Sequence, residues 1–280
     1  MIKFVGLLQI YKFCRIMRIA FVHGRFPAGG AERITIDIAR YLKDCGGYEV
    51  YVYTSRLNRE MMPAGLEDVL KVRKLPSQAV QRNRSKAIEE FINEDRIDIL
   101  VQVTKPVSGI EGIRQRTGCK TIVACHGEPF WQRHAIVYRR QKGFFRKLMW
   151  HLYNKRRFQD GKLAMEMAKK RTLKHYKGCD AYTVLCDAYK RETELALGIR
   201  PEDSHIFAIE NSELPARDCN LQKENLILFC GRLENWSKRV DRLLRIWEKV
   251  QDRLPQWKLE IVGDGEDSNM LRKMAEELEL

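Results

Sequence analysis

The chain has 280 residues, of which 44% are hydrophobic and 31% are charged, and its formal net charge is +14. This apolar content excludes a disordered chain and is enough for one large or two modest globular domains. The eight cysteines are scattered and form no Cys-x-x-Cys pair, which favours buried, reduced thiols in a cytoplasmic protein over disulfides or a zinc site.

Residues 1–16 form a segment of their own ahead of the first predicted strand. They combine a positive charge with an apolar run, but Lys12 and Arg15 interrupt the run and no small-residue cleavage site follows. The segment is also too short to span a bilayer. Two interpretations stay open: an interfacial anchor, or a leader upstream of a start at Met17. The second is favoured, because the first strand begins immediately afterwards.

A strand, a loop and a helix follow in order. Residues 19–22 form a short apolar strand, residues 23–30 a loop, and residues 31–43 a helix whose apolar positions recur on one face. A second strand follows at 48–54. The sequence therefore predicts the opening βαβ unit of a parallel sheet.

The loop of this unit contains Gly24, Gly29 and Gly30. Their spacing is not the G-x-G-x-x-G of dinucleotide-binding folds, and no acidic residue closes the next strand. The loop also lacks the G-K-[ST] of a phosphate-binding P-loop. NAD, FAD and ATP are therefore disfavoured as its ligands.

Short apolar strands alternate with helical patterns along most of the chain. Strands that alternate with helices imply parallel sheets wound through right-handed crossovers, so the expected class is α/β. The predicted strands are 97–103, 120–124, 181–185 and 206–209, and the clearest helical patterns are 86–93 and 188–197.

Residues 131–177 carry nearly all of the net charge. Fifteen lysines and arginines stand against Asp160 and Glu166, a balance of +13, and aromatic and aliphatic residues are interleaved with them. Such a pattern is typical of a helix on an anionic membrane surface, where each cation contributes about 1 kcal/mol. The alternative is a pair of solvated helices whose apolar faces pack on the sheet. Nucleic acid is not expected as a partner, because no recognised nucleic-acid-binding signature accompanies the charge.

The segment from 226 to 247 gives the strongest indication of function. An apolar strand runs into Gly231, a helical pattern follows, and Arg232 and Lys238 lie in the loop between them. Glycine lets a ligand approach the backbone, the helix end supplies partial positive charge, and the two side chains supply full charges. The sequence therefore predicts a diphosphate-binding loop. A strand-to-helix turn with solvated basic residues is the alternative.

Six motifs in this order resemble those of the retaining nucleotide-sugar glycosyltransferases of family 4, which have the GT-B fold of two facing Rossmann-like domains. The resemblance runs from about residue 17 to the end of the chain. It implies a complete N-terminal acceptor-side domain at 17–217 and a partial donor domain at 218–280. The motifs are GGAER after the first strand, VACHGEPF around His126, TVLCDAYKRE at 183–192, IENSEL at 209–214, GRL…K from Gly231 to Lys238, and IVGDGE at 261–266.

The resemblance implies donor-binding roles for two groups of residues. Gly231, Arg232 and Lys238 match the motif that holds the nucleotide diphosphate, where positive charge offsets that of the leaving group. Gly29 and Gly30 match the loop that approaches donor phosphate and acceptor from the other domain. Lys238 stands one residue further from Arg232 than is common in the family. The neighbouring arginine, at position 239, is therefore an alternative for its role.

The resemblance also implies residues on the acceptor side. His126 matches the family's histidine beside the reacting sugar and is the implied catalytic residue, with a purely structural histidine as the alternative. Phe130 and Trp131 are candidates to stack on an acceptor sugar, with core packing as the alternative. The family's chemistry needs no metal, so neither a metal site nor a cofactor is expected. The implied donor is a UDP- or GDP-linked sugar.

The second domain is shorter than the resemblance requires. From residue 218 to the end there are 63 residues, whereas a usual domain has about 100 to 150. The family's later loop with two glutamates eight positions apart, which binds the donor's sugar and ribose, has no counterpart here. The sequence therefore predicts a C-terminally truncated donor domain with apolar faces left uncovered. Weak nucleotide-sugar binding and little or no turnover are the expected consequences.

Two functions stay open on this basis. The first is a glycosyltransferase, or its truncated remnant, that moves a hexose with retention to a glycan or lipid-linked acceptor in cell-surface polysaccharide assembly. It would be cytoplasmic and peripheral on the inner face of the membrane. The second is a non-catalytic basic α/β module that binds anionic membrane or nucleic acid.

Overall fold

The chain divides into two compact units. One consists of Met1–Trp131 with Ala168–Leu214, and the other of Gln132–Met167 with Pro215–Leu280. The domain boundary expected between 217 and 218 lies outside the described residues. Residues 1–15 of the expected leader also lie outside them. The computed structural model describes residues 16–27, 29–76, 81–103, 109–138, 144–158, 161–211 and 223–280.

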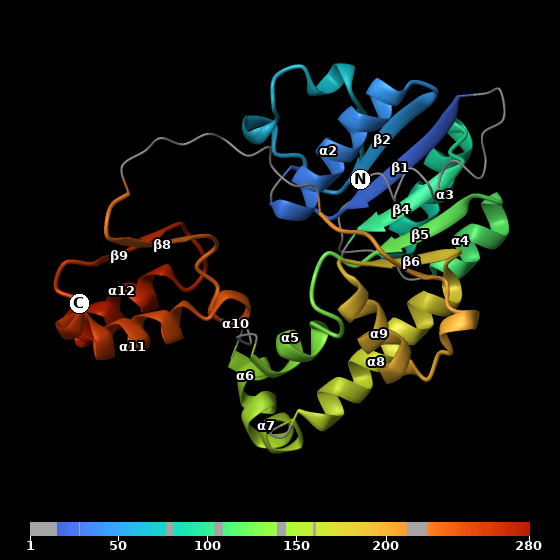
Figure 1. Ribbon diagram of the computed structural model, residues 1–280. Coiled ribbons are helices and arrows are strands. Elements are labelled where there is room, and N and C mark those ends of the chain that lie inside the picture. Colours follow the sequence, from blue (N-terminus) through green and yellow to red (C-terminus); the bar gives the residue numbers. More distant parts are fainter. Residues whose placement is uncertain are drawn as a thin grey trace. The chain divides into compact units, whose positions relative to one another are not determined.

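The first unit is built on a seven-stranded sheet in the order β3-β2-β1-β4-β5-β6-β7 (Figure 1). Every neighbouring pair of strands is parallel. This arrangement confirms the α/β class and the Rossmann-like N-terminal domain. The strands are β1 (Met17–His23), β2 (Tyr48–Thr54), β3 (Lys71–Lys74), β4 (Ile99–Val103), β5 (Lys120–Ala124), β6 (Ala181–Val184) and β7 (Ile206–Ala208).

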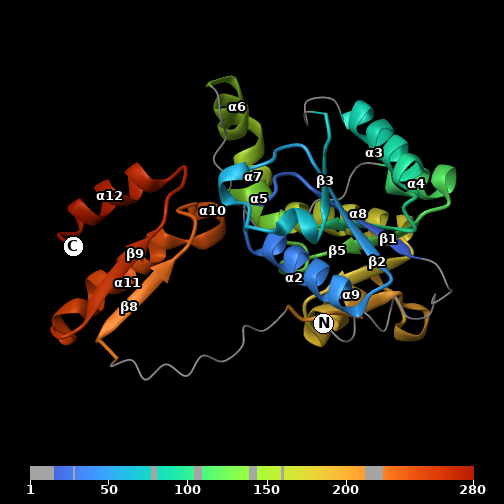
Figure 2. The same ribbon diagram turned by 90° about the horizontal axis from the view of Figure 1, so that it is seen from above.

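Helices cover both faces of this sheet. Figures 1 and 2 show α2 along one face and α3 and α4 along the other. Short 3-10 turns, η1 (Arg59–Met61), η2 (Leu66–Asp68) and η4 (Pro201–Asp203), lie in the connections. The helices are α2 (Gly30–Cys45), α3 (Gln81–Asp95), α4 (Ile110–Thr117), α8 (Lys162–Gly178) and α9 (Asp187–Leu197).

The alternation of side chains along the strands explains why both faces are covered. Ile19 and Phe21 of β1 belong to the apolar cluster under α2, whereas Ala20 and Val22 belong to the cluster under α3 and α4. All four are at most 3% exposed. Because burial of a large apolar side chain contributes about 1.5–3 kcal/mol, a strand that is apolar at every position is stable only between two helical layers. The carboxyl ends of the strands form one open edge.

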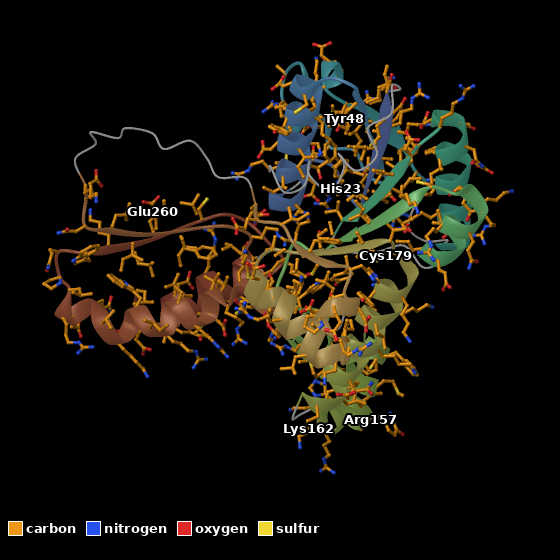
Figure 3. The ribbon with its side chains drawn as sticks, turned by 45° about the vertical axis from the view of Figure 1, so that its right-hand side comes forward. His23, Tyr48, Arg157, Lys162, Cys179 and Glu260 are labelled. Atoms are coloured by element: carbon orange, nitrogen blue, oxygen red, sulfur yellow. The ribbon has the colours of Figure 1, made fainter. Side chains whose placement is uncertain are left out.

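The second unit contains a smaller parallel pair, β8 (Leu226–Cys230) and β9 (Lys258–Val262). Its core is formed by Leu233, Val240, Leu244 and Leu271. Figure 3 shows Glu260 on the side of the strands away from the helices. The helices that follow these strands are α10 (Asn235–Lys238), α11 (Val240–Val250) and α12 (Ser268–Glu277), with the 3-10 turn η5 (Gln251–Arg253).

Apolar side chains of this strand pair are exposed, as the sequence predicts. Leu228 is 58% exposed, Val262 is 43% exposed and Ile227 is 37% exposed. Among the described residues, helices cover the pair on one face only.

The remaining helices of the second unit belong to the basic segment. They are α5 (Gln132–Tyr138), α6 (Phe144–Met149), the π-helical turn η3 (Trp150–Asn154) and α7 (Lys155–Arg157). Trp150 and Phe158 stack with ring centroids 5.8 Å apart. Within the part of the chain that the structure describes, no helix combines the length and apolar character needed to cross a membrane.

The described cysteines are all free thiols. Cys119, Cys125 and Cys179 are buried, and burial raises the pKa of Cys119 and of Cys179 to about 12, so these thiols stay protonated. Cys45 and Cys230 are exposed. The expected burial is thus confirmed for three thiols and wrong for Cys45 and Cys230, while Cys186 is half-buried. Cys230 ends a strand whose outer face is covered by no helix of the described residues.

Candidate functional site

The glycine loop ends at the N-terminus of α2. Gly29 caps this 16-residue helix in an extended conformation, its carbonyl accepts a hydrogen bond from the Arg33 N–H at 3.0 Å, and no side chain caps the helix. A Cβ added at Gly30 would meet no atom within 4 Å, whereas one at Gly29 would lie 3.2 Å from Glu32 Oε2. The helix end therefore supplies partial positive charge, which suits an anion, and the Glu32 carboxylate of the first turn lies beside it.

His23, at the end of β1, lies beside the same helix turn (Figure 3). Its Nε2 lies 2.9 Å from Thr35 Oγ1, and its Nδ1 lies 3.6 Å from Glu32 Oε1. Thr35 in turn donates to the Ala31 carbonyl at 3.3 Å. The sequence reasoning did not single out this histidine, although its position as the last residue of the strand before a glycine loop was visible.

His126 follows β5 and lines a small cavity at the carboxyl edge of the sheet. The cavity measures about 30 Å³, room for a water molecule or two, and Glu210 and Asn211 also line it. Burial lowers the pKa of His126, the charge of His23 lowers it further, and a hydrogen bond with Asn211 and the charge of Glu32 act in the opposite direction. The imidazole is therefore neutral near neutral pH.

One nitrogen of that imidazole lacks a partner. His126 Nδ1 is buried and makes no hydrogen bond with any residue in the ranges that the structure describes. A buried nitrogen of this kind costs about 1–3 kcal/mol until a hydroxyl or a water satisfies it. Asn211 was not singled out either, although it belongs to the IENSEL motif that carried part of the resemblance. The two residues give the cavity a hydrogen-bonding wall.

Phe130 and Trp131 face the interior. Phe130 is 2% exposed and takes a positive φ of 58°, and Trp131 packs against the cluster that contains Cys125 and Tyr182. This placement favours the core-packing alternative over stacking on an acceptor sugar.

In the second unit, the loop after β8 is held by the loop after β9. Gly231 N–H donates to the Val262 carbonyl at 3.0 Å, and Leu233 N–H donates to the Asp264 carbonyl at 2.9 Å. A Cβ at Gly263 would lie 3.0 Å from the Gly231 carbonyl carbon and closer still to its oxygen, and Gly263 has φ +150°. Only glycine fits at 263. The IVGDGE motif thus acts as a clamp on the diphosphate-binding loop predicted from the sequence.

Asp264 serves this clamp as a turn residue. Its carboxylate accepts hydrogen bonds from Ser268 Oγ at 2.8 Å and from the Gly265 N–H at 2.7 Å. The hydrogen bond from Ser268 is the main reason that its pKa is lowered. The carboxylate is therefore used within the turn that precedes α12.

The cations of the loop differ in their partners. Arg232 is exposed and its Nη1 lies 3.2 Å from Glu234 Oε1. Lys238 ends the short helix α10 and does not lie in an open loop as expected, because a one-turn helix forms between the strand and α11. It is exposed, and among the described residues no carboxylate pairs with its ammonium group.

Arg239, in contrast, forms an ion pair with Asp241. It has φ +52°, and its Nε and Nη2 contact the two carboxylate oxygens of Asp241 at 3.1 and 2.9 Å. Burial raises the pKa of Asp241, but the hydrogen bonds and charge of Arg239 outweigh burial and the net shift is downward. This bidentate pair leaves Lys238, the residue that the sequence favoured, as the cation available to a ligand.

Two parallel α/β units, each with its loops at the carboxyl ends of its strands, define the GT-B class of glycosyltransferase folds. Comparison with known families agrees. Residues 28–208 match the model described as Glycosyltransferase Family 4, and residues 213–280 match that of Glycosyl transferases group 1. The chain belongs to glycosyltransferase family 4.

Individual relatives agree with this assignment. An uncharacterized glycosyltransferase of Haemophilus influenzae is 23% identical over 263 residues, which cover 93% of this chain and 65% of the relative. The solved structure of WaaG, a glycosyltransferase involved in lipopolysaccharide biosynthesis, matches with a TM-score of 0.59 at 18% identity. The match covers 93% of this chain and 67% of the WaaG chain. The lipopolysaccharide outer core galactosyltransferase WaaB gives 0.53 at 18% identity, with coverage of 94% and 65%. The chain spans about two thirds of the length of these relatives.

Proposed function

We propose that the protein transfers a hexose, with retention of configuration, from a UDP- or GDP-linked donor to a glycan or lipid-linked acceptor in cell-surface polysaccharide assembly. The observation that carries this proposal is the clamped loop from Gly231 to Lys238, at the end of which the exposed Lys238 ammonium group pairs with no carboxylate of the described residues. The names of two fold relatives, WaaG and WaaB, support an acceptor of lipopolysaccharide type.

The proposed roles fall into two groups: contacts with the leaving diphosphate and contacts with the sugar. Arg232 and Lys238 offset the negative charge that builds up on the diphosphate as the bond to the sugar breaks. The start of α2, next to Gly29 and Gly30, adds the partial positive charge of a helix N-terminus, beside which the Glu32 carboxylate also lies. The assignment of His126 to the reacting sugar rests on the resemblance, and a water in its small cavity would satisfy the buried Nδ1 of the neutral imidazole.

Titration of the full chain with UDP and GDP, alongside a glycosyl-transfer assay with UDP- and GDP-hexoses, tests the proposal. Replacing both Arg232 and Lys238 by alanine should abolish measurable nucleotide affinity, because each charge-assisted contact contributes about 1.5–3 kcal/mol. Binding to anionic vesicles should persist. Nucleotide affinity that is unchanged in the double variant would support the alternative, a non-catalytic basic module that binds anionic membrane or nucleic acid.

We further propose that the protein works on the cytoplasmic face of an anionic membrane, through the surface of α6, η3 and α7. Phe144 is 81% exposed, Phe145 is 72% exposed, and Tyr153 is 65% exposed. Three exposed cations follow at 155–157. Exposed aromatic rings next to cations suit the boundary between lipid headgroups and acyl chains, which supports the membrane interpretation for this part of the basic segment.

Flotation with vesicles of phosphatidylglycerol tests this surface. Phe144→Ser together with Phe145→Ser should weaken vesicle binding about tenfold or more, because each buried ring contributes about 1.5–3 kcal/mol. Met61→Ser is the matched control, since Met61 is 58% exposed on the first unit. Equal loss in both variants, or equal binding to neutral phosphatidylcholine vesicles, would count against the membrane surface.

A further inference from the structure

A second, larger hollow lies at the carboxyl ends of β2 and β3 in the first unit. It has a volume of about 610 Å³, within the range of about 300–1,000 Å³ that small-molecule sites occupy. None of the residues assigned to the donor or to the reacting sugar lines it. Its polar lining consists of Ser55, Arg56, Asn58, Arg59, Glu60 and Lys74.

The three cations of this hollow carry unneutralised charge. Arg56, Arg59 and Lys74 are exposed, and none of them forms an ion pair with another residue that the structure describes. Two cations on the same strand, β3, are paired instead. Lys71 Nζ lies 3.3 Å from Glu49, and Arg73 Nη1 lies 2.9 Å from Asp95. The cations that line the hollow are therefore not neutralised by any described carboxylate, whereas the two neighbouring cations of β3 are.

A buried hydroxyl in the lining also lacks a partner. Ser55 is 7% exposed, and its Oγ makes no hydrogen bond with any residue in the described ranges. The backbone next to Ser55 is held in place, because the Arg56 carbonyl accepts hydrogen bonds from the Phe26 N–H at 2.8 Å and from Thr54 Oγ1 at 3.1 Å. An oxygen of a ligand would satisfy the hydroxyl, which otherwise costs about 1–3 kcal/mol.

The charges and hydrogen-bonding groups of the lining residues indicate which class of ligand the hollow can bind. Three cations against one carboxylate favour an anion, and Asn58 and Glu60 offer hydrogen-bond partners for hydroxyl groups. Among the described residues that line the hollow there is no aromatic ring on which a nucleobase could stack. We propose that this hollow, the anion pocket, binds a phosphate-bearing sugar unit of the acceptor. The phosphate lies between the cations, and the sugar hydroxyls face Asn58 and Glu60.

The distance between the anion pocket and His126 indicates how long the acceptor must be. The pocket follows β2 and β3, whereas His126 follows β5, which is three strands from β2 in the sheet. At about 4.8 Å per strand, the two places are roughly 14 Å apart. A single sugar unit does not bridge this distance, so the phosphate belongs to a different unit from the hydroxyl that is glycosylated. The assignment of the ligand to the acceptor rests on the proposed transferase function. The proposal that the anion pocket binds a sugar phosphate does not depend on that function.

Calorimetric titration of the full chain with glucose 6-phosphate, glucose, glucuronate and inorganic phosphate tests the pocket. Glucose 6-phosphate should bind at least tenfold more tightly than glucose or inorganic phosphate, because it alone engages cations and hydroxyl-binding groups together. Arg56→Gln with Lys74→Gln should weaken that affinity about tenfold or more, and Ser55→Ala should weaken it less. Lys71→Gln is the matched control and should leave the affinity within about twofold, because Lys71 is already paired.

Three results would overturn the proposal. They are no saturable binding of glucose 6-phosphate, equal loss in the control variant, and inorganic phosphate or glucuronate binding as tightly as the sugar phosphate. UDP titration of the same variants separates this proposal from the previous one. The anion-pocket variants should retain wild-type UDP affinity, whereas failure of the wild-type chain to bind UDP would remove the proposed donor site and leave the sugar-phosphate result intact.

Discussion

Gly263→Ala should unlock the loop that carries Gly231 and Leu233. The new Cβ would lie 3.0 Å from the Gly231 carbonyl carbon and closer to its oxygen, and φ at 263 is +150°. The two loops must separate, which breaks the hydrogen bonds from Gly231 N–H and Leu233 N–H. Two lost hydrogen bonds contribute about 2 kcal/mol and the backbone conformation about 1–3 kcal/mol, so the expected destabilisation is about 3–5 kcal/mol.

Amide hydrogen exchange measured on the Leu233 N–H reports this loss directly. Its protection should fall by a factor of roughly 100 or more in Gly263→Ala. Gly46→Ala is the matched control, because Gly46 has φ +66° but its added Cβ meets no atom within 4 Å. The control should lose about 1–3 kcal/mol, in its own turn, from backbone strain, and should leave the protection of the Leu233 N–H unchanged. Unchanged Leu233 protection in Gly263→Ala would refute the clamp.

Two further changes test other parts of the site and fold. Gly30→Ala should raise the free energy of unfolding by about 0.4–1 kcal/mol, because the added Cβ meets no protein atom and alanine restricts the unfolded chain more than glycine does; a lower free energy of unfolding would show that the start of α2 has no room for the methyl group. Burial, then the charges of Arg171 and Lys174, lowers the pKa of His175 to about 4 from its ordinary value of 6.5. The unfolded chain therefore binds a proton before the folded chain does, so stability present above pH 6.5 is lost as the pH falls towards 4. Denaturant titrations between these pH values should show a slope of up to about 1.4 kcal/mol per pH unit that His175→Gln removes, and an unchanged slope in the variant would contradict the assignment.

The sequence predicted the interior strands well because their signal is local. β2 and β5 have the bounds that the apolar runs indicated, and the helix predicted at 86–93 is the central part of α3. In these strands the same residues that favour extended backbone also fill the core on both faces, so propensity and packing agree.

Strand β3 could not be predicted in this way. Its sequence, Lys-Val-Arg-Lys, contains one apolar residue, and the strand forms because it pairs with β2 at the edge of the sheet. Arg73 lies 3.6 Å from the centre of the Phe91 ring and pairs with Glu94 at 2.6 Å. These contacts come from a helix about twenty residues away. A short window of sequence contains none of this information.

The candidate site was predicted in part for a similar reason. The positions of Gly231, Arg232 and Gly30 in strand-to-helix loops were visible as motifs. The choice between Lys238 and Arg239 was not, because it depends on the pair that Arg239 makes with Asp241. The spacing Arg-x-Asp was present in the sequence, but only the left-handed backbone at 239 brings the two side chains together.

The most direct test of the account compares Lys238→Gln with Arg239→Gln in calorimetric titrations with UDP and GDP. Lys238 lies at the end of the clamped loop and pairs with no carboxylate in the described ranges, so its loss should weaken binding of the preferred nucleotide about tenfold or more. Arg239 is held by Asp241, so its loss should change that affinity by less than about threefold. Equal effects of the two changes, or no effect of Lys238→Gln, would contradict the assignment of this loop to the donor diphosphate.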